Sequence, residues 1–142
     1  MNDDELRQAM TLMDAYKNRV EALSRQVQIL RASLDEINMA LAAVGAFKDA
    51  EEGDEIMVPI GASSSVRMKV TSDRSVVVGI GSGVSVQKSA EEAIEYYEAS
   101  SAEINEALKK SVELLNEAQQ NLSAVNDAVQ QEYAARRQAG AY

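Results

Sequence analysis

A chain of 142 residues with a formal net charge of −9 and no cysteine already excludes several classes of protein. Such an acidic chain is a poor ligand for nucleic acid or anionic membranes, because those affinities come from lysine and arginine, and without cysteine there is neither disulfide nor thiolate chemistry. Aromatic residues make up only 4% of the sequence, so we expect one elongated module rather than a compact globule. The acidic start, Asp3 to Glu5, is unlike a signal peptide, and no apolar run could span a bilayer, so we expect a cytoplasmic location.

Residues 1–47 predict one long amphipathic helix. Apolar side chains recur at alternating spacings of three and four residues, which is the a/d pattern of a coiled coil. The positions are Leu6, Ala9, Met13, Tyr16, Val20, Leu23, Val27, Leu30, Leu34, Ile37, Leu41 and Val44. Asn2 or Asp3 can cap the helix, and the pattern predicts that it ends near residues 44–47.

Residues 48–88 predict an acidic linker followed by two β-hairpins. The linker carboxylates could form a hard-cation site, but their spacing does not match an EF-hand, and a solvated loop is the better interpretation. They are Asp49, Glu51, Glu52, Asp54 and Glu55. Four short runs follow with the alternation of strands, at residues 56–60, 66–70, 76–80 and 84–86, separated by turns at 61–65, 71–74 and 81–83.

The valine-rich strands predict assembly with other chains. A two-stranded hairpin alone is marginal in water, and residues 76–80 are apolar on both faces, so we expect each face to be covered. The hairpins should therefore join a larger sheet supplied by other subunits.

Residues 89–142 predict a second long helix. Ser89 and Glu92 form a capping box, and the three-and-four spacing returns at Ile94, Tyr97, Ser101, Ile104, Leu108, Ser111, Leu115, Ala118, Leu122, Val125 and Val129. The two helices match in length, so we expect the second to fold back antiparallel along the first. The alternative is that each helix pairs with another chain in a parallel dimer.

The residues that catalysis usually needs are absent. Without histidine or cysteine the chain lacks the commonest general base, metal ligands and nucleophile pairs. The glycines of residues 79–83 resemble a phosphate loop, but no Lys-Ser/Thr follows, and a hairpin turn explains them better. We therefore expect no enzyme, no cofactor, no metal and no ATP.

The free helix ends are candidates for a binding surface. If the helices are antiparallel, apolar side chains from both ends gather there, with Tyr142 at a similar height. They are Leu6, Met10, Leu12, Met13, Val129 and Tyr133. Methionine is common on promiscuous binding surfaces, and Met10 and Leu12 flank the seam. Alternatively, Met13 and Val129 are simply seam core and the single exposed apolar residues are ordinary surface, and both interpretations stay open.

The central motifs resemble the α class of prefoldin subunits. These motifs are VPIGA at residues 58–62, the strand-turn-strand at 66–80, VGIGSGV at 78–84, and the cap SAEE at 89–92 leading into EAIE at 92–95. In that class two hairpins join the helices, as predicted here, whereas the β class has one.

The resemblance implies a mainly α fold, with a long antiparallel intrachain coiled coil and two β-hairpins that enter an inter-subunit β-barrel. It implies an ATP-independent chaperone of the holdase type, in which two α subunits assemble with four prefoldin β subunits. The coiled-coil tips would hold unfolded proteins and deliver them to a group II chaperonin. The assembly residues would be Ile60, Val66, Met68, Val70, Val76, Val78, Ile80, Val84 and Val86, and the six tip residues named above would contact clients. The alternative function is a structural coiled-coil tether or scaffold that dimerises through its β insert.

Overall fold

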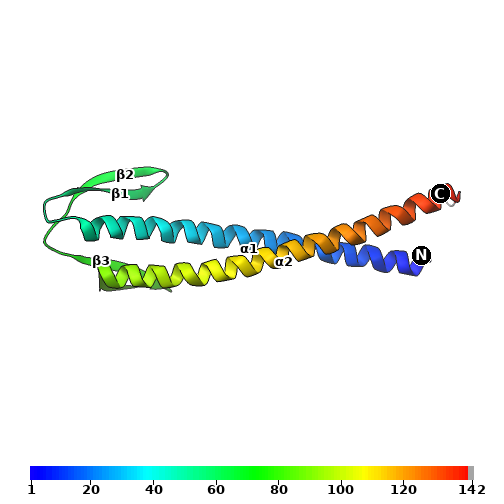
Figure 1. Ribbon diagram of the computed structural model, residues 1–142, viewed down its shortest axis with the longest axis horizontal. Helices are drawn as coiled ribbons and strands as arrows, with labels where there is room; N and C mark the ends of the chain where they lie inside the picture. Colours follow the sequence, from blue (N-terminus) through cyan, green and yellow to red (C-terminus); the bar gives the residue numbers. More distant parts are fainter. Residues whose placement is uncertain (141–142) are drawn as a thin grey trace. The chain divides into compact units, whose positions relative to one another are not determined.

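The computed structural model describes residues 1–140 and contains two long helices joined by two β-hairpins (Figure 1). The elements in chain order are α1 (Asp3–Asp49), β1 (Glu55–Gly61), β2 (Ser64–Lys69), β3 (Ser75–Gly81), β4 (Val84–Ser89) and α2 (Ala90–Gln138). They fall into two compact units, one with residues 1–30 and the chain from 107 onward, the other with residues 31–106. In each unit a segment of α1 lies beside a segment of α2. This arrangement confirms the predicted antiparallel hairpin of helices within one chain. Tyr142 lies outside the described residues.

Both helices begin at the caps that the sequence predicts. The Oδ1 atom of Asn2 accepts a hydrogen bond from the Glu5 amide at 2.8 Å, and the Glu5 side chain accepts one from the Asn2 amide at 3.2 Å. Ser89 Oγ accepts from the Glu92 amide at 3.1 Å. These bonds satisfy amide groups that a helix start leaves without a partner inside the helix. Helix α1 continues to Asp49, slightly beyond the predicted end.

The three-and-four pattern marks the covered stripe of each helix. Every predicted seam position of α1 and α2 is buried or half-buried, whereas most positions between them are exposed. Ser111 is buried as well, although it is polar. The pattern therefore located the helix contacts correctly, including the two places where serine interrupts the apolar run.

Each hairpin is a separate two-stranded antiparallel sheet, as predicted. The strands extend further than expected, because Ser64 and Ser65 belong to β2 and leave only Ala62 and Ser63 as the first turn. Ala62 and Ser63 have φ of 51° and 58°, and Ser82 and Gly83 of the second turn have 53° and 73°. Positive φ at both central residues is the mark of a type I′ turn, which matches the twist of the flanking strands.

The core of the unit formed by residues 31–106 lies where β3 meets the two helices. Val78 is fully buried there, with Val44 of α1 and Ala90 and Ala93 of α2. Phe47, Val76, Ile94, Tyr96 and Tyr97 pack around this cluster. Val77, on the opposite face of β3, is 65% exposed within this chain, so the cover that other subunits were expected to supply stays a prediction.

Arg74 fixes the end of α1 to the start of β3. Its Nη2 atom donates to the carbonyl oxygens of Phe47 at 2.7 Å and Ala50 at 2.8 Å, and its guanidinium lies 4.5 Å from the centre of the Phe47 ring. The last carbonyls of a helix have no partner inside the helix. The Arg74 side chain therefore caps α1 from a residue 24 positions beyond Ala50.

Candidate functional site

The six predicted tip residues lie together in the unit that contains both helix ends, but only two of them are open to solvent. Leu6 and Val129 are 7% and 1% exposed and belong to the core of this unit, while Met13 and Tyr133 are half-buried. Met10 and Leu12 are 40% and 46% exposed. Of the six, Met10 and Leu12 are therefore the side chains that a polypeptide can reach, and Met1 is exposed beside them.

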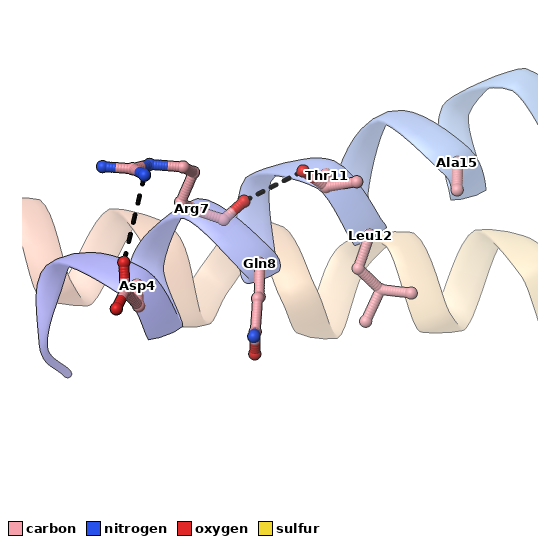
Figure 2. A pocket seen from close by; sticks show the side chains of 6 residues that line it. All are labelled: Asp4, Arg7, Gln8, Thr11, Leu12 and Ala15. Atoms are coloured by element: carbon pink, nitrogen blue, oxygen red, sulfur yellow. Dashed lines mark hydrogen bonds and ion pairs between the residues drawn. The ribbon is translucent and has the colours of Figure 1, made fainter.

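A groove of about 570 Å³ runs along the first turns of α1 beside Leu12. Its lining residues are Asp4, Arg7, Gln8, Thr11, Leu12 and Ala15. Figure 2 shows Gln8 and Leu12 projecting from the same side of the helix, while Arg7 turns away toward Asp4, 3.9 Å from its carboxylate. Thr11 donates its hydroxyl to the Arg7 carbonyl at 3.1 Å. The groove thus combines an exposed Leu with an amide side chain.

A polar clasp, formed by Arg136 with the groups it contacts, ties the start of α1 to the end of α2. The guanidinium of Arg136 donates to Asp3 Oδ1 at 2.7 Å, to Glu132 Oε1 at 3.0 Å and to the Met1 carbonyl at 3.2 Å. The hydrogen bond from Arg136 is the main cause that lowers the pKa of Glu132 below its ordinary 4.5. The clasp keeps the helix ends together over the buried Leu6 and Val129.

Tyr133 and Met10 form a second link between the helices. The Tyr133 hydroxyl donates to the Met10 sulfur at 3.4 Å, so the exposed thioether is held at a defined place beside α2. Sequence patterns could suggest the Glu132–Arg136 pair, since it has the i,i+4 spacing of helical ion pairs. They could not reveal the contacts of Arg136 with residues at the other end of the chain.

The predicted assembly residues divide into a buried minority and an exposed majority. Val70 and Val78 are buried within the chain, and Val76 is half-buried. The exposed members are Ile60, Val66, Met68, Ile80, Val84 and Val86. So many large exposed apolar side chains are unusual on two small hairpins. Such a cluster is typical of a surface that another chain covers.

Neither a metal site nor a membrane span is found among the residues described. Within residues 1–140, no group of three or more His, Cys, Asp and Glu side chains could hold a metal ion. In the acidic linker, the Asp54 carboxylate accepts a hydrogen bond from the Glu51 amide at 2.8 Å, which shapes the turn. Over the same residues, neither helix offers the long apolar stretch that crossing a membrane requires.

Comparison with known proteins identifies the family of this chain. The family model described as "Prefoldin subunit" matches residues 16–135. The chain belongs to the prefoldin family. A prefoldin subunit alpha of Methanothrix thermoacetophila is 36% identical over 108 residues, covering 76% of this chain and 71% of that protein. A prefoldin subunit alpha of Pyrococcus horikoshii is 34% identical over 119 residues, covering 78% of this chain and 79% of that protein.

A solved structure supports the fold as well as the family. The filamentous prefoldin of Methanocaldococcus jannaschii matches with a TM-score of 0.50 and 26% sequence identity, covering 91% of this chain and 98% of that chain. The helix–two hairpins–helix order is thus shared with a solved prefoldin chain, and the resemblance drawn from the central motifs is confirmed.

Proposed function

We propose that this prefoldin chain is a subunit of an ATP-independent chaperone that holds unfolded polypeptides at its helix ends. In this proposal two copies assemble through their hairpins with four prefoldin β subunits, and the loaded complex passes its client to a group II chaperonin. Prefoldin membership and the names of the α-subunit relatives support the assembly. The sequence has no histidine and no cysteine, which fits a passive role, and we propose no enzymatic activity.

The observation that carries the proposal is the exposed pair Met10 and Leu12 beside the groove on α1. An unfolded segment can bury its own apolar side chains against this pair, and each buried methylene contributes about 0.8 kcal/mol. One such contact is weak, so several tips must act on one client. Linked weak sites raise the overall affinity through effective concentration.

Leu6 and Val129 have a different place in the proposal. They are buried against the facing helix, so they contact a client only when the helix ends separate. Met13 and Tyr133, which are half-buried, sit between the two groups. We propose that Met10 and Leu12 make the first contact and that the others join as the ends open.

The test is suppression of aggregation of an unfolded model protein by the assembled complex. Met10→Gln with Leu12→Gln should greatly reduce protection, because glutamine keeps helix propensity but removes the apolar surface. Ile29→Gln is the matched control, since Ile29 is a 66% exposed apolar residue of the same helix that lies outside the groove. The control should protect like the natural sequence.

Native mass spectrometry of each complex shows whether assembly is intact. If the Met10/Leu12 double variant assembles and still protects fully, the site assignment is wrong. If the chain instead forms a one-to-one complex with a folded partner and does not protect unfolded proteins, its function is that of a tether and not of a chaperone.

A further inference from the structure

The two most deeply buried tip residues share their helix faces with the polar clasp. Leu6 of α1 and Val129 of α2 are 7% and 1% exposed. Asp3 precedes Leu6 by about one turn, and Arg136 follows Val129 by about two turns, so each polar residue lies on the same face of its helix as a buried one. The clasp therefore closes the terminal end of the stripe that contains Leu6 and Val129.

Arg136 is the centre of the clasp because its guanidinium bonds to groups at both ends of the chain. On its own helix it donates to Glu132 Oε1 at 3.0 Å, and this bond orients the side chain. At the other end of the chain it donates to Asp3 Oδ1 at 2.7 Å and to the Met1 carbonyl at 3.2 Å. Removing this one side chain therefore removes two hydrogen bonds that hold the helix ends together.

The bond between Arg136 and Asp3 is of a kind that opens readily. The Asp3 side chain is 81% exposed and the Arg136 side chain is 19% exposed. Water and salt weaken an ion pair with so exposed a partner, and such a pair stabilises a fold only modestly. Helix ends are also the places where local opening costs least. A small change at the clasp can therefore shift the balance between closed and separated helix ends.

We propose that the clasp is autoinhibitory: it holds the helix ends closed and so limits the access of an unfolded polypeptide to Leu6 and Val129. The inference rests on the proposed function, in which these two residues contact a client once the ends separate. A client that binds the open form more tightly shifts the equilibrium toward that form. Its apparent dissociation constant is the intrinsic constant divided by the open fraction, so a larger open fraction should tighten client binding.

The clasp controls how much apolar surface a client reaches. Met10 and Leu12 are exposed while the ends are closed, so a client can contact them in either form. The open form adds Leu6 and Val129, which are the most deeply buried of the six tip residues. Loss of a residue that only stabilised the fold would leave client binding unchanged or weaken it. Loss of Arg136 should strengthen client binding, and this difference in sign makes the proposal testable.

Arg136→Gln tests the clasp, and Arg137→Gln is its matched control. The control removes the same charge one residue away, where the arginine side chain is exposed and, within residues 1–140, makes no hydrogen bond or ion pair. Hydrogen exchange with mass spectrometry measures the opening of the helix ends in the assembled complex without a client. Arg136→Gln should raise the exchange rates of residues 1–12 and 129–138 by roughly threefold to tenfold, and Arg137→Gln should leave them unchanged.

The affinity for a client is measured on the same complexes with fluorescently labelled lysozyme that has been reduced and alkylated to keep it unfolded. Its dissociation constant should decrease by roughly threefold to tenfold in Arg136→Gln, in proportion to the open fraction, and stay the same in Arg137→Gln. Because both variants lose one positive charge, a general electrostatic attraction of the client would affect them alike. Asp3→Asn keeps the arginine and should shift both measurements in the same direction by a smaller amount. Circular dichroism establishes that each variant remains helical.

Unchanged exchange in Arg136→Gln would show that the clasp does not hold the ends closed and would overturn the proposal. Faster exchange with equal or weaker client binding, or equal shifts in both arginine variants, would overturn the autoinhibition. A natural complex that binds no client would refute the chaperone function itself. Client binding that the Arg136→Gln change does not strengthen would instead leave the chaperone function standing and refute only the role of the clasp.

Discussion

Replacing Arg74 with alanine should destabilise the region where α1 ends and β3 begins. The side chain donates to the carbonyls of Phe47 and Ala50 and lies over the Phe47 ring. A hydrogen bond from a charged donor contributes about 1.5–3 kcal/mol, and a cation–π contact contributes about 0.5–1 kcal/mol at a partly exposed site. However, the Arg74 Nη1 atom is buried and finds no hydrogen-bond partner among the described residues. The loss of its contact with water offsets part of the stabilisation that the other contacts give.

The net expectation is a loss of about 3 kcal/mol from the free energy of unfolding of the purified chain, measured by urea denaturation with circular dichroism. In a chain of this size that corresponds to a melting temperature lower by about 10 °C. Arg74→Lys should recover less than half of the loss, because an ammonium group lacks the planar fork that reaches both carbonyls.

A double-mutant cycle with Phe47→Leu separates the ring contact from the carbonyl contacts. The coupling between the two positions should be about 0.5–1 kcal/mol, which is the cation–π share. If Arg74→Ala costs less than about 1 kcal/mol, or if Arg74→Lys behaves like the natural sequence, the capping role is refuted.

Four further changes test local features. Val129→Ala should cost about 2 kcal/mol in urea denaturation, because it leaves a gap in the buried contact at the helix ends. Ser89→Ala should cost about 1 kcal/mol in the same measurement through loss of the cap on α2. Ser63→Gly should raise the free energy of unfolding by about 0.5 kcal/mol, and with it the melting temperature slightly, since Ser63 holds a φ of 58° that glycine adopts without strain. The pKa of Glu132 is lowered in the folded chain by Arg136, so its contribution to stability is present above the ordinary pKa of 4.5 and is lost as the pH falls through the folded value. Glu132→Gln should weaken the fall of the melting temperature with decreasing pH, measured in melting curves at a series of pH values.

The helices were predictable because their information is local and repeated. Twelve seam positions on α1 at regular spacing leave one covered stripe, and the structure buries or half-buries all of them. The capping box at Ser89 placed the start of α2 for the same reason, since the cap bonds to an amide three residues away. The hairpins followed from their alternation and their glycines.

The contacts between residues far apart in sequence were not predictable in this way. The sequence predicts that Arg74 lies in a turn, and nothing near it in the chain indicates that it caps α1. Arg136 reads as a surface charge at the end of α2, and its bond to Asp3 exists only because the helices fold back. By contrast, the division of the tip residues into buried Leu6 and exposed Leu12 did follow from the apolar pattern, because Leu6 is a seam position and Leu12 is not.

The two hairpins show how an apolar strand can serve two purposes. Val78 and Val77 are neighbours with the same side chain, yet one is fully buried in its own chain and the other is 65% exposed. The first fixes β3 on the helices, and the second stays exposed on the opposite face of the strand. A charged side chain or a proline, such as Pro59 in β1, protects a strand edge against pairing with other chains. The chain has neither proline nor charge at positions 76–80, which fits the proposed role of the hairpins in assembly with other chains.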